Sequence, residues 1–376
     1  MPDTPPPPAV PVSAGELRQA AQDAANWLLV EAGRGWPTTE HRMRFPRRFG
    51  FGGDGEEHAS DVLARAVIAL EILHAADAPA GRNIPALQRL RSNVVPAEAK
   101  HVARARLADR GGGWSYFPTL PELPPDLDSL AAALCLFSLA APNYLPLTYA
   151  PARLALDSAS AEGAIGTWLL APDDARSALK RMRYGISKHF GRGVDVEVVA
   201  RFYLGLQLAD PGHYADAITR GADFVARQQR PDGAFTATWY FGDICGTLLC
   251  LQLLCTLDAH RQPRSRALAF LTAAVREDGG FGLWQSTPLE TAAAIQALVL
   301  LQLADKSIVE RAVRRLLDFQ AQHGGFNPSP WIRMDIGRPA RRVEKSLIHQ
   351  SAAVSTAFCL RALVEAQHFL EPASRP

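Results

Sequence analysis

The sequence has few of the features that mark secreted, membrane-spanning or nucleic-acid-binding proteins. Only five of its 376 residues are cysteine, and an odd number of thiols in apolar runs indicates reduced, buried side chains in a reducing compartment. No apolar run reaches the ~20 residues of a membrane-spanning helix, and no secretory leader is visible. The 40 Lys and Arg residues are balanced by 38 Asp and Glu residues, which gives no global field for nucleic acid. We therefore expect a cytoplasmic protein with no integral membrane segment and no nucleic-acid partner; its oligomeric state stays open.

Period-two alternation, the mark of strands, is also scarce. Apolar residues make up 48% of the chain and charged residues 21%, and Ala, Leu, Arg and Gln fill long helical patterns. The proline-rich segment 1–13 is typical of a disordered tail. We expect residues 14–370 to form one all-α domain.

One unit recurs along this domain. An amphipathic helix ends in a turn with glycine and an aromatic residue, a variable loop follows, and a helix that is apolar on all sides comes next. The clear turns lie at residues 110–114, 229–235, 278–281 and 320–326, with a looser copy at 31–36. Around residues 161–174 the pattern predicts helix without such a turn.

Six such helix pairs can close into an α/α toroid, a single barrel in which each pair buries the face that its neighbour exposes. The inner helices would start at one rim, and their polar first residues would converge on a central cavity. The alternative is an open solenoid in which these residues only cap helices.

The most informative stretch is Asp126-Leu127-Asp128-Ser129, which follows two prolines and opens a helix apolar on every side. A helix with this pattern is buried, so two carboxyl groups stand at the edge of an apolar interior. Either they cap the helix, or they form an acid–base pair whose pKa values are shifted by burial and by each other.

The turns resemble the repeat of the squalene–hopene cyclase and protein prenyltransferase superfamily, in which a Gln is followed by Gly four residues later and by Trp or Phe two residues after that. Gln229-Gly233-Phe235 and Gln320-Gly324-Phe326 match this spacing in full. The resemblance implies the toroid. Within the superfamily, residues 126–129 look like the Asp-x-Asp-Asp motif of class II terpene cyclases, with Ser129 in place of the last aspartate.

The class II resemblance implies a protonation-initiated cyclase that acts on a linear isoprenoid, a prenyl diphosphate that keeps its diphosphate. Asp128 would be the acid and Asp126 its partner. Such an acid must be undissociated although an ordinary Asp has a pKa of about 3.9, and burial of two neighbouring carboxyl groups can hold one proton between them. No cofactor is required; magnesium would accompany a diphosphate substrate.

Other residues in the same loops are candidates for binding the substrate. Aromatic faces stabilise carbocations, although any single ring can equally serve packing between repeats. Basic residues precede the first and last apolar helices, which are neighbours in a closed ring, and arginine matches phosphate oxygens; the alternative is an ordinary basic surface. The candidates are Trp114, Tyr116, Phe117, Trp239, Tyr240, Trp284, Trp331, His349, Glu290, Arg42, Arg44 and Arg338.

Three alternatives stay open. A zinc-dependent prenyltransferase-like enzyme would use Asp243, Cys245 and His349, although another repeat separates the two parts, and we expect no metal site. A carbohydrate-active toroid would pair Asp128 with Glu290 or Asp243 across the cavity. A non-catalytic toroid would only bind a ligand or a partner protein.

Overall fold

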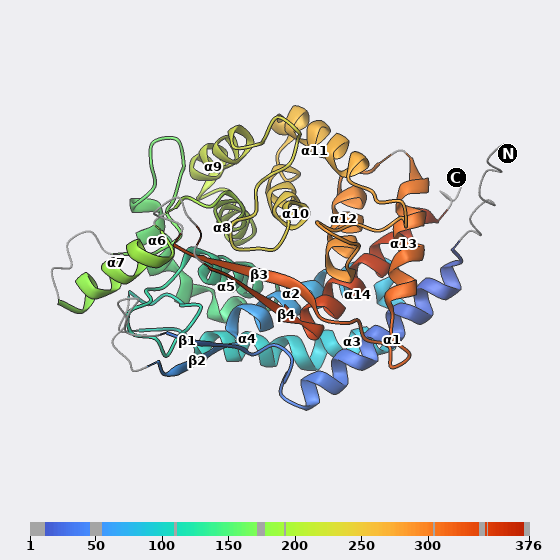
Figure 1. Ribbon diagram of the computed structural model, residues 1–376, viewed down its shortest axis with the longest axis horizontal. Coiled ribbons are helices and arrows are strands. Elements are labelled where there is room, and N and C mark those ends of the chain that lie inside the picture. The colour runs from blue at the N-terminus through green and yellow to red at the C-terminus, as the bar shows by residue number, and fades with distance from the viewer. Residues whose placement is uncertain are drawn as a thin grey trace.

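Six inner helices form a closed ring at the centre of the molecule (Figure 1). The computed structural model describes residues 12–45, 55–108, 111–170, 177–191, 193–303, 305–337, 343 and 345–371. Each inner helix contacts the next, and the last one contacts the first. This closure confirms the α/α toroid and excludes the open solenoid. The inner helices are α2 (Val62–Asp77), α5 (Leu127–Ala140), α8 (Val196–Ala209), α10 (Asp243–Leu254), α12 (Pro288–Leu300) and α14 (Ala352–Leu370).

A second layer of helices surrounds the ring. These helices are amphipathic; α9, for example, buries only Ile218, Gly221, Ala222 and Val225, which lie on one face. Helix α7 (Ser177–His189) lies at the edge of the molecule, outside the pairs (Figure 1). None of the described helices is long and apolar enough to cross a membrane. The outer layer consists of α1 (Ala14–Gly33), α3 (Pro85–Arg89), α4 (Val95–Arg104), α6 (Tyr149–Asp157), α9 (Ala215–Arg227), α11 (Arg261–Ala273) and α13 (Lys306–Phe319), with short 3-10 or π segments at Gly81–Asn83, Leu90–Val94, Pro142–Thr148 and Asp258–His260.

The glycine turns share one backbone geometry, and the structure adds a copy that the sequence pattern missed. Residues 161–170 are not helical, so the predicted helix is wrong there; residues 171–174 lie outside the described part. Ser160 N–H donates to the carbonyl of Ala164 over 2.9 Å, as Arg230 does to Ala234. Ile165 is fully buried in the place that Phe235 takes in its own turn. An aliphatic residue at the aromatic position concealed this repeat.

The glutamine of the repeat ties each turn to the next outer helix. The Gln229 amide donates to the carbonyls of Gly233 and Pro263, both over 2.8 Å. The Gln320 amide donates to Gly324 and to Ala20, again over 2.8 Å. Because Ala20 belongs to α1, the last turn of the chain is bonded to the first outer helix. The glutamine hydrogen bonds that join neighbouring repeats therefore also join the last repeat to the first.

Replacing Gly233 by alanine is expected to lower the free energy of unfolding by more than about 2 kcal/mol. Gly233 has φ +92°, where a side chain costs about 1–2 kcal/mol, and a Cβ would lie 2.2 Å from the Arg266 carbonyl oxygen. Urea unfolding measures the change. Gly33→Ala is the matched control, because nothing lies within 4 Å of its Cβ position; equal stability of both variants would contradict this account.

Two antiparallel hairpins, which the sequence pattern did not predict, precede the first and last inner helices. Strands β1 (His41–Arg44) and β2 (Glu57–Ser60) pair His41 with Ser60. Strands β3 (Ser329–Ile336) and β4 (Lys345–Ser351) pair Ser329 with Ser351 and carry an irregularity between Pro330 and Ile332. Figure 1 shows β3 and β4 running from α14 across the middle of the ring towards α7. This hairpin covers one end of the barrel.

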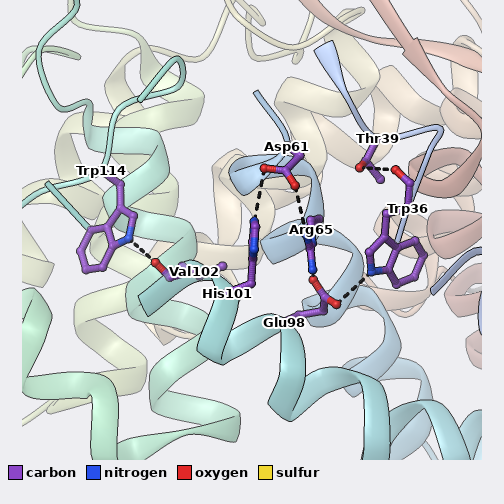
Figure 2. A network of polar contacts seen from close by, with 8 residues as sticks. All are labelled: Trp36, Thr39, Asp61, Arg65, Glu98, His101, Val102 and Trp114. Carbon is purple, nitrogen blue, oxygen red and sulfur yellow. Dashed lines mark hydrogen bonds and ion pairs between the residues drawn. The ribbon is translucent and has the colours of Figure 1, made fainter. Parts of the chain in front are cut away.

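The start of α2 is tied to the outer layer rather than to the barrel interior (Figure 2). Asp61 accepts from Arg65 Nη1 over 3.1 Å and lies 3.3 Å from His101 Nε2. Glu98 of α4 accepts from Trp36 Nε1 over 2.9 Å and also binds Arg65. The polar start of this helix therefore does not converge on the centre, contrary to the expectation for all six.

Candidate functional site

An apolar cavity lies under the β3–β4 hairpin, at the N-terminal ends of the inner helices. About 490 Å³ of space in this region, part of it open to solvent, is not filled by protein atoms. Its walls come from the loops before α2, α5, α8 and α10 and from β3, so it is built by residues far apart in the sequence. We call it the acid chamber; it is lined by Phe45, Leu63, Tyr116, Phe117, Leu123, Asp126, Asp128, Thr167, Trp168, Phe190, Trp239, Ile332 and Met334.

Asp126 both caps α5 and faces the acid chamber. Its carboxylate accepts from the backbone N–H of Ser129 over 2.7 Å, from the Ser129 hydroxyl over 3.1 Å and from the Tyr116 N–H over 2.8 Å. The side chain is 4% exposed. Burial, with the charge of Asp128 as a further cause, raises the pKa of Asp126 to about 7, against these stabilising donors. The capping and the acid–base interpretations therefore apply to the same residue.

Asp128 lies in the first turn of α5 and binds one residue of α8 and one residue of the loop before α10. Arg201 Nη1 donates to Oδ1 over 3.2 Å, and the Tyr240 hydroxyl donates to Oδ2 over 2.7 Å. Arg201 also bonds to the Tyr240 hydroxyl. Asp128 and Arg201 are each 6% exposed. Two carboxyl groups and one guanidinium are thus buried together, and this cluster is neutral when the pair holds one proton.

Sequence reasoning missed Arg201. Its signal is a single cation within the apolar run Val196–Ala209, because a buried charge requires a partner. The partner could not be named, since Asp128 lies 73 residues earlier in the chain.

A second carboxyl pair stands at the start of α8, with the spacing of the first. Asp195 Oδ2 accepts from the Thr167 hydroxyl and from Trp239 Nε1, both over 2.6 Å. Glu197 Oε1 accepts from the backbone N–H groups of Thr238 and Trp239. Burial, then the charge of Asp195, raises the pKa of Glu197 to about 8. This pair holds the loop that presents Trp239 to the chamber.

The predicted aromatic residues separate into two groups. Tyr116, Phe117 and Trp239 line the acid chamber, and Tyr240 reaches Asp128. Three aromatic wall residues were not predicted, Phe45, Trp168 and Phe190. None of them stands in a predicted glycine turn or at a predicted inner-helix start.

Trp114, Trp284 and Trp331 are not chamber walls, which corrects the prediction. Trp114 packs edge-on against Phe137 and donates to the Val102 carbonyl over 2.6 Å (Figure 2), so it fills the gap between repeats. Trp284 is 71% exposed. Trp331 is buried beneath the hairpin, near the ring of Tyr240.

Glu290 and His349 also have other roles than predicted. Glu290 and Thr287 form a reciprocal cap at the start of α12, with the Glu290 N–H donating to the Thr287 hydroxyl over 3.2 Å and that hydroxyl donating to the Glu290 carboxylate over 3.1 Å. His349 stacks on His41, with ring centroids 4.3 Å apart. Burial lowers the pKa of His349 to about 4 and that of His41 to about 3. The two loops meet at the seam, as a closed ring requires, through neutral imidazoles.

The basic residues predicted at the seam are engaged by acids. Arg42 binds Glu40 over 2.8 Å and Glu57 over 3.0 Å. Arg44 is exposed and lies 3.8 Å from Glu57. Arg338 lies outside the described residues. Acids within the β1–β2 hairpin balance the charges of Arg42 and Arg44, and their role in binding phosphate stays a prediction.

The three residues proposed as zinc ligands are not gathered at one site in the described part of the chain. Asp243 is ion-paired with Arg230, and Cys245 is a buried free thiol. Within the described ranges, no three His, Cys, Asp or Glu side chains gather as a group that could hold a metal ion.

The buried carboxyl groups make stability depend on pH. The pKa values of Asp126 and Glu197, about 7 and 8, exceed the ordinary 3.8 and 4.5. Between these values the two carboxyl groups bind more protons in the folded chain than in the unfolded one, whereas His41 and His349 act in the opposite direction below their ordinary 6.5. The free energy of unfolding is therefore expected to fall as pH rises from about 6.5 to 8. Glu197→Gln removes one of these titrations and is expected to flatten the slope, which urea unfolding at several pH values measures. Stability that rises over this range would contradict the expectation.

The fold and the acid pair place the chain among α/α toroids of the terpene cyclase superfamily. Residues 63–339 match the squalene-hopene cyclase C-terminal domain. The chain therefore belongs to the squalene-hopene cyclase C-terminal domain family.

The curated relatives have low sequence identity to this chain and are longer than it. Drimenyl diphosphate synthase of Streptomyces showdoensis is 25% identical over 194 residues, 49% of this chain and 35% of that protein. Ent-copalyl diphosphate synthase of Streptomyces sp. (strain KO-3988) is 27% identical over 144 residues, 37% of this chain and 28% of that protein. The chain thus spans about a third of the length of these relatives.

Solved structures match over nearly the whole chain. The type II terpene cyclase MstE from Scytonema superposes with a TM-score of 0.69 at 18% identity, covering 96% of this chain and 100% of that one. The ent-copalyl diphosphate synthase from Streptomyces platensis gives a TM-score of 0.56 at 18% identity, with 81% of this chain and 50% of that one covered. These likenesses establish the fold.

Proposed function

We propose that the protein cyclises a linear isoprenoid by protonating its terminal alkene in the acid chamber. The observation that carries this proposal is the buried pair Asp126 and Asp128, which faces an aromatic cavity and is balanced by a single buried cation, Arg201. An alkene is a weak base, so it needs an undissociated acid and surroundings without water.

The two carboxyl groups have different tasks in this proposal. Asp126, with its pKa of about 7, holds the shared proton at rest. Asp128 donates the proton to the alkene, and Arg201 and Tyr240 bond to the carboxylate that remains after the transfer. These donors stabilise the charge that develops in the transition state.

The first chemical step is proton transfer from Asp128 to the alkene. The O–H bond of Asp128 breaks and leaves its electron pair on the carboxylate. The proton bonds to the less substituted carbon of the terminal alkene, and the neighbouring carbon becomes a tertiary cation. The next alkene of the chain donates its π electrons to that cation and forms the first ring bond. Asp126 remains bonded to Ser129 and Tyr116 throughout.

The aromatic walls support the cationic stages. The rings of Trp168 and Trp239 meet edge to face with centroids 5.7 Å apart, and Phe117 meets Phe45 in the same way at 5.0 Å. Ring faces attract cations by about 0.5–2 kcal/mol each. These interactions strengthen only after protonation, so they lower the barrier without holding the substrate more tightly.

The head group of the substrate is retained in this proposal. The names of the curated relatives, drimenyl diphosphate synthase and ent-copalyl diphosphate synthase, support a prenyl diphosphate. A structure of an MstE variant in complex with geranylgeranyl dihydroxybenzoate supports a prenylated aromatic acid as the other class. The chain's own residues supply the proton in both cases, and magnesium would only accompany a diphosphate.

The test is incubation of the purified protein with farnesyl diphosphate, geranylgeranyl diphosphate and geranylgeranyl dihydroxybenzoate. Extracts, dephosphorylated where needed, are analysed by gas or liquid chromatography with mass spectrometry. Cyclic isomers of a substrate are expected. Conversion of none of the three substrates would overturn the proposal.

A further inference from the structure

The acid chamber also contains a polar pair, Thr167 and Asp195, that is placed to accept a proton rather than to donate one. Thr167 lines the chamber, and its hydroxyl donates to Asp195 Oδ2 over 2.6 Å. The hydroxyl oxygen thereby keeps a lone pair for another donor. The buried carboxylate behind it can accept the proton that the hydroxyl carries.

Asp195 is the carboxylate of the second pair that faces Thr167. Trp239 Nε1 donates to the same oxygen as the Thr167 hydroxyl, over 2.6 Å. The neighbouring Glu197 is fully buried, and its carboxylate is bonded to the backbone of the Trp239 loop instead. Asp195 is therefore the carboxylate of the two that a proton from Thr167 can reach.

Thr167 is held beside the acid pair by the backbone. The N–H of Leu127, the residue between Asp126 and Asp128, donates to the Thr167 carbonyl over 2.8 Å. Asp126 forms an isolated antiparallel bridge with Trp168. The proton donor and the Thr167 hydroxyl thus lie on neighbouring backbone segments of one wall, and both residues line the chamber.

We propose that Thr167 and Asp195 end the cyclisation by removing a proton from the final carbocation; this inference rests on the proposed function and names the termination step. The C–H bond next to the cationic carbon breaks, and its electron pair forms the product alkene. The proton bonds to the Thr167 hydroxyl oxygen, while the hydroxyl's own proton passes to Asp195. A C–H bond beside a carbocation is acidic enough for a neutral hydroxyl to accept its proton. Asp195 regains its charge by losing the proton to solvent after product release.

Tyr116 is the competing base, because its hydroxyl also lines the chamber and lies 3.0 Å from His41 Nδ1. His41, the group behind Tyr116, is a weaker proton acceptor than Asp195, the group behind Thr167. Burial, and then the nearby His349, lower the pKa of His41 to about 3, so this imidazole resists a proton. A carboxylate is the better final acceptor, and the geometry favours Thr167.

The test is Thr167→Val, which keeps the size of the side chain and removes the hydroxyl, assayed on the substrate that the wild type converts. Substrate consumption is expected to continue, because the acid pair is intact. The wild-type alkene is expected to fall about tenfold or more as a share of the products, replaced by other double-bond isomers or by water-quenched alcohols. Thr167→Ser is expected to restore the wild-type product, and Asp195→Asn to reproduce the valine variant.

The controls separate this inference from the proposed function. Thr148→Val removes a buried hydroxyl bonded to the Leu145 carbonyl, away from the chamber, and is expected to leave the products unchanged. An unchanged product distribution in Thr167→Val overturns the inference and leaves the cyclase proposal standing. A product distribution that changes only in Tyr116→Phe also overturns it, because it would assign the proton removal to Tyr116. A wild type that cyclises nothing overturns both.

Discussion

Asp128→Asn is expected to abolish cyclisation at every pH, a loss of about 10²–10⁴-fold or more in kcat. Asparagine keeps the shape of the side chain but carries no transferable proton, and its one oxygen can accept from only one of Arg201 and Tyr240. Asp126→Asn is expected to behave differently. Without the second carboxyl group, no proton is shared within the pair, and Asp128 remains as the ion-pair partner of Arg201. Activity should therefore return as the pH falls.

The measurement is the rate of product formation from pH 4 to 9 for the wild type and both variants. Asp157→Asn, at an exposed position on α6, is the matched control for an Asp-to-Asn change. Thermal unfolding of each variant shows whether the fold persists. Wild-type rates in a folded Asp128→Asn variant would remove Asp128 as the donor, and identical pH profiles for the two variants would contradict the division of tasks.

The parts of the structure that could be predicted are the local ones. The turn Gln320-Gly324-Phe326 is recognisable because the C-terminal cap, the positive φ of the glycine and the buried ring all lie within seven residues. The same holds for Asp126 and Asp128, which open an apolar helix. The clear glycine turns and the acid pair therefore needed no knowledge of distant contacts.

The site around the acid pair could not be predicted, because it is assembled across repeats. Arg201 is one cation among many until the ring closes and brings it to Asp128. Trp114 and Trp239 occupy similar loops, yet one packs between α4 and α5 and the other lines the chamber. The position of Trp239 depends on hairpin β3–β4, because the backbone N–H of Arg333 donates to the Trp239 carbonyl over 2.8 Å. The irregularity between Pro330 and Ile332 hides that hairpin from an alternation pattern.

Arg201→Leu is expected to lower the free energy of unfolding by about 3–5 kcal/mol at pH 8, because it leaves the buried carboxylate of Asp128 without its cation. The double variant Arg201→Leu with Asp128→Asn should regain a large part of this loss, since no uncompensated charge remains. The loss in the single variant should also shrink as the pH falls. Protonation of the carboxyl pair at low pH removes the stranded negative charge.

A double-mutant cycle by urea unfolding at pH 5 and pH 8 measures both effects. Arg153→Leu is the control, because its pair with Asp157 is exposed, with 85% and 68% of the two side chains accessible, and such pairs contribute at most about 1 kcal/mol. Equal losses for Arg201→Leu and for the double variant would mean that the arginine stabilises the barrel by packing alone. The charge balance of the acid pair, on which the shared proton depends, would then be wrong. A coupling that appears only above the pKa of Asp126 would place that proton between the two carboxyl groups.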